Sequence, residues 1–447
     1  MARTVLEEAD NELMGGRDEG LIVVGFRERR VVTLFGDVRI RRRLYRDREG
    51  KGRYLLDEAM SLDKRSPLSP GMRELSALLS SYMPFGKCER LLRMLLPTGV
   101  SHTTVHRQVG RITEPVLARE DEEIVEVFEK GKAPEAGEKE VPLLFLEGDG
   151  VSVALQREEE RRTEVKVGIA YEGWEEIGSR YRLKDKTVCL GLMGSDRFWE
   201  GFSLSLARKY NLGKVGQVVV GGDGANWVRK GAELSGGMYQ LDRFHLRRAM
   251  LRGLGNDPGL ADAVYRACTS GDVGLADSLL IRAQSQAHAD RERAAAIADL
   301  RSYILDNACG LADYRLKLNG MDGLDGLRGL GSIEGNVDKL VASRMKKRGM
   351  SWTKRGIRRM TRLIQMQHEG QISGWKTLPR LAEPAITREV PRIRVRGKKR
   401  DEGAWLNMDL PALRGPHQNR SWVLGLDHIA HGSSAVRAFP GFKPTER

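Results

Sequence analysis

The sequence predicts an α/β protein in which short strands and helices precede a mixed sheet flanked by helices. Two apolar runs, residues 141–146 and 217–220, lead into the glycine-flanked aspartate motifs Glu147-Gly148-Asp149-Gly150 and Gly222-Asp223-Gly224. Short apolar runs bounded by turn residues are typical of buried strands. We therefore expect both aspartates at or near one edge of a single sheet, where two carboxylates can bind a divalent metal.

Length and composition limit the class of protein. A chain of 447 residues is too long for one ordinary core and predicts two to four structural units. No apolar run approaches the roughly 20 residues that a membrane span needs, and the amino terminus lacks the order of a secretory signal. We expect a cytoplasmic protein with no membrane partner. The cysteines Cys88, Cys189, Cys268 and Cys309 are widely spaced, which favours reduced, mostly buried thiols over a zinc site or disulfides.

The charge predicts a polyanionic partner. Lys and Arg number 75 against 61 Asp and Glu, a net charge of +14, and cations gain free energy by displacing counterions from nucleic acid. Residues 339–362 carry ten cations and no acid, so we expect something outside this tract to neutralise them. A second basic cluster occupies residues 392–400, with a solvated tail as the alternative interpretation.

The N-terminal residues 20–57 are expected to form short strands at 21–24, 31–35 and 37–45, with a turn at Gly36-Asp37. In the last strand Arg39, Arg41 and Arg43 would share one face, opposite Val38 and Ile40. Strict alternation breaks at Arg42. The pattern predicts a basic rib that could contact phosphate.

A helix-turn-helix is predicted next. After a helix marked by apolar residues at 72, 75, 78 and 79, a first helix at residues 87–96 is followed by a turn at 97–100 and a second helix capped by Ser101. The second helix then presents His102, Thr103, His106 and Arg107 outward, where such a motif contacts bases. An ordinary helical hairpin is the alternative.

Residues from 141 onward predict the core. Strands at 163–171 and 187–193, a helix at 197–210, the strand ending at Asp223 and a helix at 225–234 follow the first strand. This order, three strands, helix, strand, helix, is that of the ribonuclease-H-like fold. A mainly helical tract, 246–330, follows. A third acid is expected on a helix that returns to the sheet, and Glu334 is the best candidate; the alternative is a first-turn acid favoured by the helix dipole after a Ser332 cap.

Five motifs follow one another along the chain in an order that is typical of one known family. They are Leu146-Glu147-Gly148-Asp149-Gly150; Lys166-Val167-Gly168-Ile169-Ala170-Tyr171-Glu172-Gly173-Trp174; Gly222-Asp223-Gly224-Ala225-Asn226-Trp227; Leu241-Asp242-Arg243-Phe244-His245; and Glu334-Gly335-Asn336-Val337, followed by Ser343-Arg344-Met345 and Met350-Ser351-Trp352. On these motifs the chain resembles bacterial insertion-sequence transposases of the ISLre type, a DDE class related to Mutator-like elements. The resemblance implies that Asp149, Asp223 and Glu334 are the catalytic triad. It also implies that Asp242 and His245 form an Asp-x-x-His signature.

The resemblance implies metal-dependent DNA strand cleavage and strand transfer. Two Mg²⁺ ions, for which Mn²⁺ can substitute, would activate the attacking oxygen and neutralise the leaving oxygen, and hard oxygen ligands suit them. Arg344, Lys347 and Arg348 would hold phosphates of the scissile strand. The implied partners are double-stranded transposon ends and target DNA, bound by a homo-oligomer that is associated with the nucleoid.

Six segments follow from these expectations: an N-terminal β-rich segment (1–65), a helix-turn-helix DNA-binding region (66–138), the first part of a ribonuclease-H-like core (139–258), a helical insertion (259–330), the core helix with the catalytic Glu (331–365) and a basic C-terminal segment (366–447). Together they predict a ribonuclease-H-like core interrupted by an all-helical insertion.

Several assignments stay open on sequence alone. Glu147 and Asp338 flank the expected ligands and are either ligands or supporting acids. His245 is either a general base or a structural partner of Asp242. Two other classes of function compete: a non-catalytic DNA-binding protein derived from a transposase, and a glycoside hydrolase with paired carboxylates. The latter would explain neither the charge nor the third acid.

Overall fold

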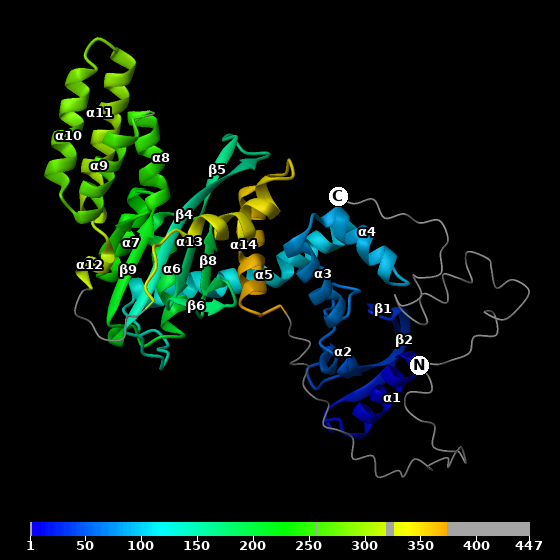
Figure 1. The fold of residues 1–447 in the computed structure, drawn as a ribbon. Helices are drawn as coiled ribbons and strands as arrows, with labels where there is room; N and C mark the ends of the chain where they lie inside the picture. The colour runs from blue at the N-terminus through cyan, green and yellow to red at the C-terminus, as the bar shows by residue number, and fades with distance from the viewer. Residues whose placement is uncertain (1, 256, 319–325, 373–447) are drawn as a thin grey trace, which may run out of the picture. The chain divides into compact units, whose positions relative to one another are not determined.

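A computed structural model describes residues 2–255, 257–318 and 326–372 of the chain (Figure 1). The described residues all belong to one compact unit. The basic cluster expected at residues 392–400 and nearly all of the C-terminal segment expected at 366–447 lie outside the described residues. The described chain is mixed α/β. None of its helices combines the length and the apolar character that crossing a membrane would require.

The N-terminal part is a three-stranded antiparallel sheet with helices at both ends of the segment. Two expectations are corrected here. The runs at 21–24 and 31–35 belong to one strand, and the turn lies at Leu34-Phe35 because Thr33 pairs with Gly36. Helices also begin and end the segment. The elements are α1 (Ala2–Gly15), β1 (Ile22–Thr33), β2 (Gly36–Arg46), β3 (Gly52–Arg53) and α2 (Leu55–Ala59).

The alternation expected in β2 is confirmed. Arg39 and Arg41 are exposed, whereas Val38 and Ile40 are buried. Arg42, at the break in the pattern, is buried and donates from Nε and Nη2 to the two carboxylate oxygens of Asp57, at 2.7 and 3.0 Å. Arg42, at which the alternation breaks, therefore forms a buried salt bridge between β2 and α2.

Three helices follow: α3 (Pro70–Tyr82), α4 (Phe85–Leu95) and α5 (His102–Ile124), with a π-helical turn η1 (Val125–Glu129) at the end of α5. Ser101 caps α5 as expected, accepting a hydrogen bond from the Thr104 N–H. Leu92 of α4 and Val105 of α5 share one apolar core with Met72 of α3. The helices and the turn of the expected helix-turn-helix are present, while its contact with DNA stays a prediction.

The central sheet has the strand order β10-β9-β4-β5-β8. β4 pairs with β5 and β5 with β8 in antiparallel fashion, whereas β9 lies parallel to both β4 and β10. The bounds are β4 (Leu143–Leu155), β5 (Arg162–Tyr171), β8 (Thr187–Gly191), β9 (Gln217–Gly222) and β10 (Met238–Leu241). The hairpin of β6 (Trp174–Ile177) and β7 (Arg180–Leu183) between β5 and β8 was not predicted.

Helices cover both faces of this sheet because β4 alternates apolar side chains toward each. Leu144 and Leu146 pack with Phe198, Trp227 and the helices α6 (Ser195–Ala207) and α7 (Asn226–Ser235). Phe145 and Val151 face the opposite side, among residues of the chain beyond Ile333. Glu147 and Asp149 have the same parity as Phe145, so β4 directs both toward that second face.

Helices fill residues 243–318, where a mainly helical tract at 246–330 was expected; its role as an insertion in a ribonuclease-H-like core stays a prediction. Four helices lie side by side beyond β10 (Figure 1): α8 (Arg243–Leu254), α9 (Pro258–Ser270), α10 (Val273–Gln286) and α11 (Arg291–Asp306). The 3₁₀ turns η2 (Leu212–Lys214) and η3 (Ala308–Gly310) and the short α12 (Tyr314–Lys317) connect elements. The chain then returns to the sheet through α13 (Ser332–Val337), the π-helix η4 (Asp338–Lys346), β11 (Ser351–Trp352) and α14 (Lys354–His368).

The basic tract at residues 339–362 is partly neutralised by residues outside it, as expected, while a polyanionic partner stays a prediction. Acids of α5, far away in sequence, neutralise much of it. Glu114 pairs with Arg355 and Arg359, Asp121 with Arg358 at 2.9 Å, and Glu120 with Arg362 at 2.8 Å. These ion pairs join α14 to α5.

A candidate acidic site on the central sheet

Two of the three expected acids lie on adjacent parallel strands. Asp149 is within β4, opposite Val167 of β5, and Asp223 directly follows the last residue of β9. β4 runs on to Leu155, so Asp149 lies within its strand, whereas Asp223 begins a loop. Both side chains are half-buried. Their carboxylates accept backbone N–H groups nearby, from Gly150 at 2.7 Å and Ala225 at 2.9 Å.

Glu147 fastens the helix of the third acid to the strand of the first. Its side chain is 1% exposed and accepts hydrogen bonds from the N–H groups of Gly331 (2.9 Å), Ser332 (3.3 Å) and Ile333 (3.2 Å). The Tyr171 hydroxyl donates a fourth at 2.6 Å. A buried carboxylate thus satisfies the free donors at the start of α13. Glu147 is therefore a structural acid, and the Ser332 cap of the alternative interpretation of Glu334 is not formed.

Glu334 projects from α13 and meets His245. The His245 Nε2 and a Glu334 carboxylate oxygen are 3.0 Å apart. The expected pairing of His245 with Asp242 is therefore replaced by a contact with the third acid. His245 lies one turn into α8, whose N-cap is Asp242, which accepts the Phe244 N–H at 2.6 Å.

Asp242 is itself enclosed at the edge of the site. Its second carboxylate oxygen is buried and has no hydrogen-bond partner among the described residues. Gly331 has a φ of +123°, and a Cβ at that position would lie 3.2 Å from this oxygen. A glycine is needed there for both reasons. Burial raises the pKa of Asp242, and the charge of Glu334 adds to the rise.

The raised pKa of Asp149 reflects its burial and also its electrostatic interaction with the other two acids. Its pKa is raised from 3.8 to about 6; burial is the largest cause and the charges of Asp223 and Glu334 contribute, while the Gly150 N–H and His245 oppose the rise. Like charges this close disfavour one another's ionised form. The site therefore concentrates negative charge that a cation would relieve.

The donor set suits a hard divalent cation. Carboxylate oxygens are the ligands that Mg²⁺ prefers, and the Asp242 oxygen without a partner adds a fourth acid at the edge. In the part of the chain that the structure describes, no group of three or more His, Cys, Asp or Glu side chains is already arranged to hold a metal ion. Glu334 is instead engaged by His245, so a metal would have to draw its carboxylate away.

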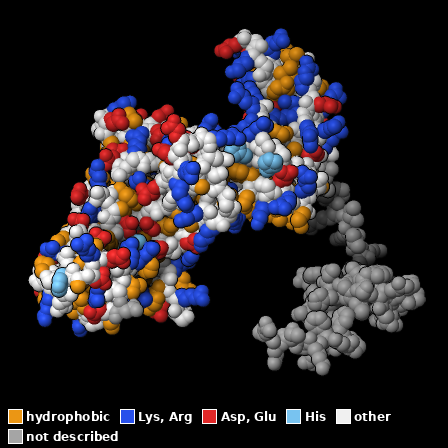
Figure 2. Space-filling view, turned by 90° about the horizontal axis from the view of Figure 1, so that it is seen from above, with side chains coloured by type: hydrophobic (Ala, Val, Ile, Leu, Met, Phe, Trp, Pro, Cys, Tyr) orange, Lys and Arg blue, Asp and Glu red, His pale blue; other side chains and the backbone are white. Residues whose placement is uncertain are grey.

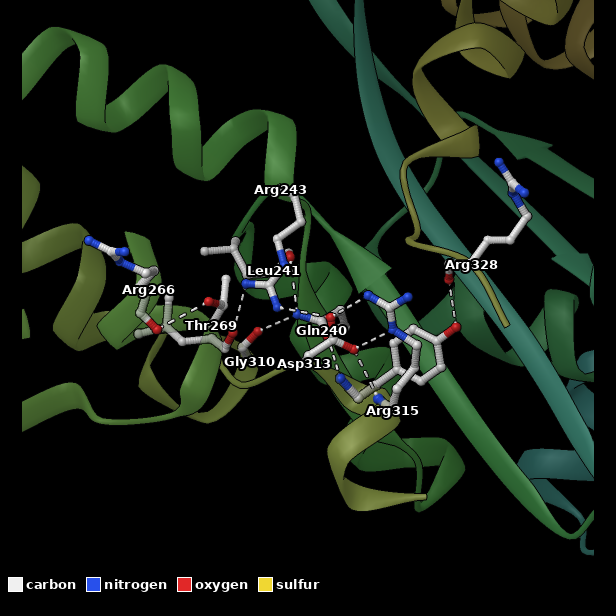
Figure 3. Close-up of polar contacts among 11 residues, drawn as sticks. Gln240, Leu241, Arg243, Arg266, Thr269, Gly310, Asp313, Arg315 and Arg328 are labelled. Carbon is white, nitrogen blue, oxygen red and sulfur yellow. Dashed lines mark hydrogen bonds and ion pairs between the residues drawn. The ribbon is translucent and has the colours of Figure 1, made fainter. Parts of the chain in front are cut away.

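The helical insertion supports the strand and helix that carry Asp242 and His245 (Figure 3). Gln240 is buried; its amide donates to the Gly310 carbonyl at 2.8 Å and its oxygen accepts the Tyr314 N–H at 2.8 Å. Arg243 donates to the Leu311 carbonyl at 2.7 Å. These contacts fix the β10–α8 junction, so the position of His245 depends on the insertion.

The residues expected to contact DNA fall into two groups. His102, Thr103, His106 and Arg107 are exposed on the first two turns of α5, as expected. Lys347 and Arg348 are exposed beyond η4, although Lys347 pairs with Asp338 at 2.5 Å. That pair places Asp338 at the surface. Figure 2 shows Lys and Arg crowded on one part of the surface, around histidines.

Arg344 corrects the prediction made for it. It is 2% exposed, its Nε donates to the Ser80 carbonyl at 2.8 Å, and its guanidinium lies 5.1 Å from the Trp352 ring centroid. Burial lowers its pKa to about 10. Unlike Lys347 and Arg348, it does not lie on the outer surface of the protein.

The comparisons place the chain in a family. A model described as an uncharacterised protein family (UPF0236) matches residues 1–378. A UPF0236 protein of Caldanaerobacter subterraneus subsp. tengcongensis is 25% identical over 376 residues, covering 82% of this chain and 73% of its own length. Another from this organism, with the same identity and coverage, has a name that joins eleven locus labels. The UPF0236 protein in the vanSb 3′ region of Streptococcus gallolyticus is 28% identical over 376 residues, covering 82% of this chain and 78% of its own. The chain belongs to the UPF0236 family.

Proposed function

We propose that this member of the UPF0236 family is a metal-dependent DNA transposase of the DDE class, which cleaves and joins DNA strands for a bacterial insertion sequence. One observation carries the proposal. Asp149 in β4, Asp223 after β9 and Glu334 in α13 interact electrostatically: burial is the main cause of the rise in the pKa of Asp149 to about 6, and the charges of the other two acids contribute to that rise. A half-buried cluster of acids that repel one another favours the binding of a cation.

The order of elements supports a ribonuclease-H-like core. Three antiparallel strands, a helix, a parallel strand and a helix follow one another as β4, β5, β8, α6, β9 and α7. This is the order on which the expectation was based. It brings the end of β9, and with it Asp223, beside β4, and the helical insertion separates the second acid from the third.

Each acidic residue has a proposed role. Asp149, Asp223 and Glu334 would hold two Mg²⁺ ions, or Mn²⁺ in their place. When bound, such ions activate an attacking water or 3′-hydroxyl and neutralise the leaving oxygen. Glu147 keeps α13 against β4, so that Glu334 stays within reach of Asp149. His245 holds the Glu334 carboxylate until the metal engages it.

DNA would be held by the exposed cations and polar residues of the N-terminal region. The first turns of α5 present His102, Thr103, His106 and Arg107, and the exposed Arg39 and Arg41 of β2 add positive charge. Lys347 and Arg348 lie beyond η4, which continues the helix of Glu334. We propose double-stranded transposon ends and target DNA as partners, bound by a homo-oligomer associated with the nucleoid.

The relatives' names add support. One UPF0236 protein of Caldanaerobacter carries eleven locus labels, another four and a third two. Several loci that share one protein name are what a sequence copied within a genome would leave. A transposase gene is copied with its element, so this pattern favours a mobile element over a fixed enzyme or regulator.

The test is cleavage of labelled DNA that carries the element's own ends, with Mg²⁺ present and absent. Asp149→Asn, Asp223→Asn and Glu334→Gln should each lower the cleavage rate by about 1,000-fold or more at matched DNA affinity, roughly 4 kcal/mol of barrier. Glu140→Gln, an exposed acid paired only with Lys214, is the matched control. If the wild type binds the ends and never cuts them, the protein is a DNA-binding derivative of a transposase. Normal cutting by Glu334→Gln would remove Glu334 from the triad.

A further inference from the structure

A cavity of about 510 Å³ lies between the N-terminal helices and the chain around β11 and α14. Its walls come from the start of α4, from α5, from the turn after β4 and from residues 344–360. None of the three acids of the proposed active site lines it. The volume is within the range of pockets that bind small molecules and cofactors.

Aromatic rings form part of the lining. Phe85 and His106 meet edge to face, with ring centroids 5.3 Å apart, and Trp352 lines the cavity as well. Burial and the charges of Arg359 and Arg107 lower the pKa of His106, which favours the neutral form of its ring. Flat rings of this kind stack on nucleobases, which all have a π-face.

The charge in the cavity has one sign. Four arginines line it, Arg157, Arg344, Arg355 and Arg359, and none of the described lining residues is Asp or Glu. Glu114 pairs with both Arg355 and Arg359, so one carboxylate serves two guanidinium groups. Arg157 has no ion-pair partner among the described residues, and its backbone is left-handed, with φ +60°. A non-glycine residue rarely adopts that conformation without a local reason.

Arg344 gives the second, independent observation. It is 2% exposed and its Nη2 is buried with no hydrogen-bond partner among the described residues. Its guanidinium lies 5.5 Å from the Phe85 centroid and 5.1 Å from that of Trp352. A buried charge without a carboxylate is costly. An anionic ligand in this cavity would offset that cost.

We propose that this cavity binds one nucleotide, with its base against Phe85, His106 and Trp352 and its phosphate toward the arginines. Rings and cations in one pocket match the two halves of a nucleotide, and guanidinium groups suit phosphate oxygens. The nucleotide is either free or unstacked from a DNA strand that lies on α5, beside His106 and Arg107. Only the second source rests on the proposed function.

The first test uses the full-length protein and isothermal titration with dAMP, deoxyadenosine, deoxyribose 5-phosphate and inorganic phosphate. dAMP should bind at least about tenfold more tightly than any of the three fragments, because only it makes both stacking and phosphate contacts. Phosphate binding as tight as dAMP would reduce the cavity to an anion site and overturn the proposal. So would the absence of dAMP binding at millimolar concentration.

Variants test whether dAMP binds in the cavity or elsewhere on the protein surface. Arg157→Ala and Trp352→Phe should each weaken dAMP binding by about tenfold. Arg344→Lys keeps the charge but loses the guanidinium geometry and should also weaken it. Arg358 lies on α14 with the cavity residues Arg355 and Arg359, but it pairs with Asp121 outside the cavity. Arg358→Ala should therefore leave dAMP affinity unchanged. If Arg358→Ala weakens dAMP as much as Arg157→Ala does, the nucleotide is elsewhere.

A second test identifies the source of the nucleotide. DNA with one 2-aminopurine at successive positions should brighten when its base leaves the stack and enters the cavity, and saturating dAMP should suppress that increase. If the fluorescence increase is lost in Arg157→Ala, the cavity binds a nucleotide that belongs to the DNA strand. Binding of free dAMP with no brightening at any position assigns it to free nucleotides. Both results are independent of strand cleavage, so failure of the transposase assignment would not affect them.

Discussion

Glu147 accepts a hydrogen bond from the Gly331 N–H at 2.9 Å, although 184 residues separate the two along the chain. This bond and its neighbours to Ser332 and Ile333 fasten α13 to β4. Asp149 is two residues beyond Glu147, and Glu334 is three beyond Gly331. The position of Glu334 relative to Asp149 is therefore set by a buried carboxylate whose oxygens already accept these hydrogen bonds.

The first prediction concerns this fastening. Glu147→Ala removes the acceptor of three backbone donors and of the Tyr171 hydroxyl, and buried donors left without partners are costly. The free energy of unfolding should fall by about 2–4 kcal/mol. Urea denaturation measures it. Cleavage should fall further than DNA affinity does, because Glu334 loses its position.

Two variants serve as controls for that prediction. Tyr171→Phe removes only one of the four hydrogen bonds and should cost about 1 kcal/mol. Glu140→Gln changes an exposed acid and should cost less than about 0.5 kcal/mol. A Glu147→Ala protein that unfolds at the same urea concentration as the wild type would mean that the hydrogen bonds do not hold α13.

The second prediction follows from the raised pKa of Asp149. Its folded value, about 6, exceeds the ordinary 3.8, so the folded state binds the proton more readily. The stability that this proton contributes is complete below about pH 4 and is lost as pH rises through 6. Asp149→Asn lacks that loss, and should be more stable than the wild type at pH 7.5 by about 1–3 kcal/mol.

Urea unfolding at pH 4, 5.5 and 7.5 checks this prediction. The gap between Asp149→Asn and the wild type should nearly close as pH falls toward 4, because Asp149 is then neutral in the folded state and close to half protonated in the unfolded state. Mg²⁺ at pH 7.5 should narrow the gap, since a ligand that binds the folded wild type stabilises it. A gap that is constant with pH would show that Asp149 does not titrate in this range.

The third prediction concerns the thiols. Cys88, Cys189 and Cys268 are buried and Cys309 is exposed, and burial raises the pKa of Cys88 and of Cys268 to about 11. The thiolate is the reactive form. A thiol reagent should therefore modify one cysteine quickly in the native protein and four in urea. Cys309→Ser should abolish the fast reaction, and a fast reaction that persists would place another thiol at the surface.

Local pattern predicted the central strands well because each buries side chains on both faces. β5 and β8 lie within a residue or two of the expected bounds, and β9 ends one residue before Asp223, as expected. β1 was split in two because residues 22–30 are largely exposed and include several arginines. That strand exists because its backbone pairs with β2, and no apolar pattern reports such pairing.

The rest depended on contacts between distant segments. Glu147 and Asp149 look alike in sequence, and only the arrival of Gly331–Ile333 distinguishes the buried structural acid from the half-buried site acid. The signal available in the sequence was Gly331, three residues before Glu334. Arg344 was misjudged for the same reason, since its partner Ser80 is 264 residues away.

The last prediction contrasts free and neutralised cations. Arg107 is exposed on α5 with no ion-pair partner among the described residues, whereas Arg358 on α14 is held by Asp121 at 2.9 Å. A cation that displaces counterions from DNA contributes about 0.9 to the slope of log K against log salt concentration. Arg107→Ala should lower the steepness of that slope by about one, and Arg358→Ala should leave it within about 0.3.

Fluorescence anisotropy with labelled end DNA between low and physiological salt measures both slopes. Asp121→Asn extends the comparison, because it frees Arg358 from its partner and should steepen the slope or leave it unchanged, never flatten it. If Arg107→Ala and Arg358→Ala lower the steepness of the salt slope equally, the ion pairs between α5 and α14 break when DNA binds. DNA phosphates would then replace the acids of α5 as partners of the arginines of α14, and the basic tract would be part of the DNA-binding surface.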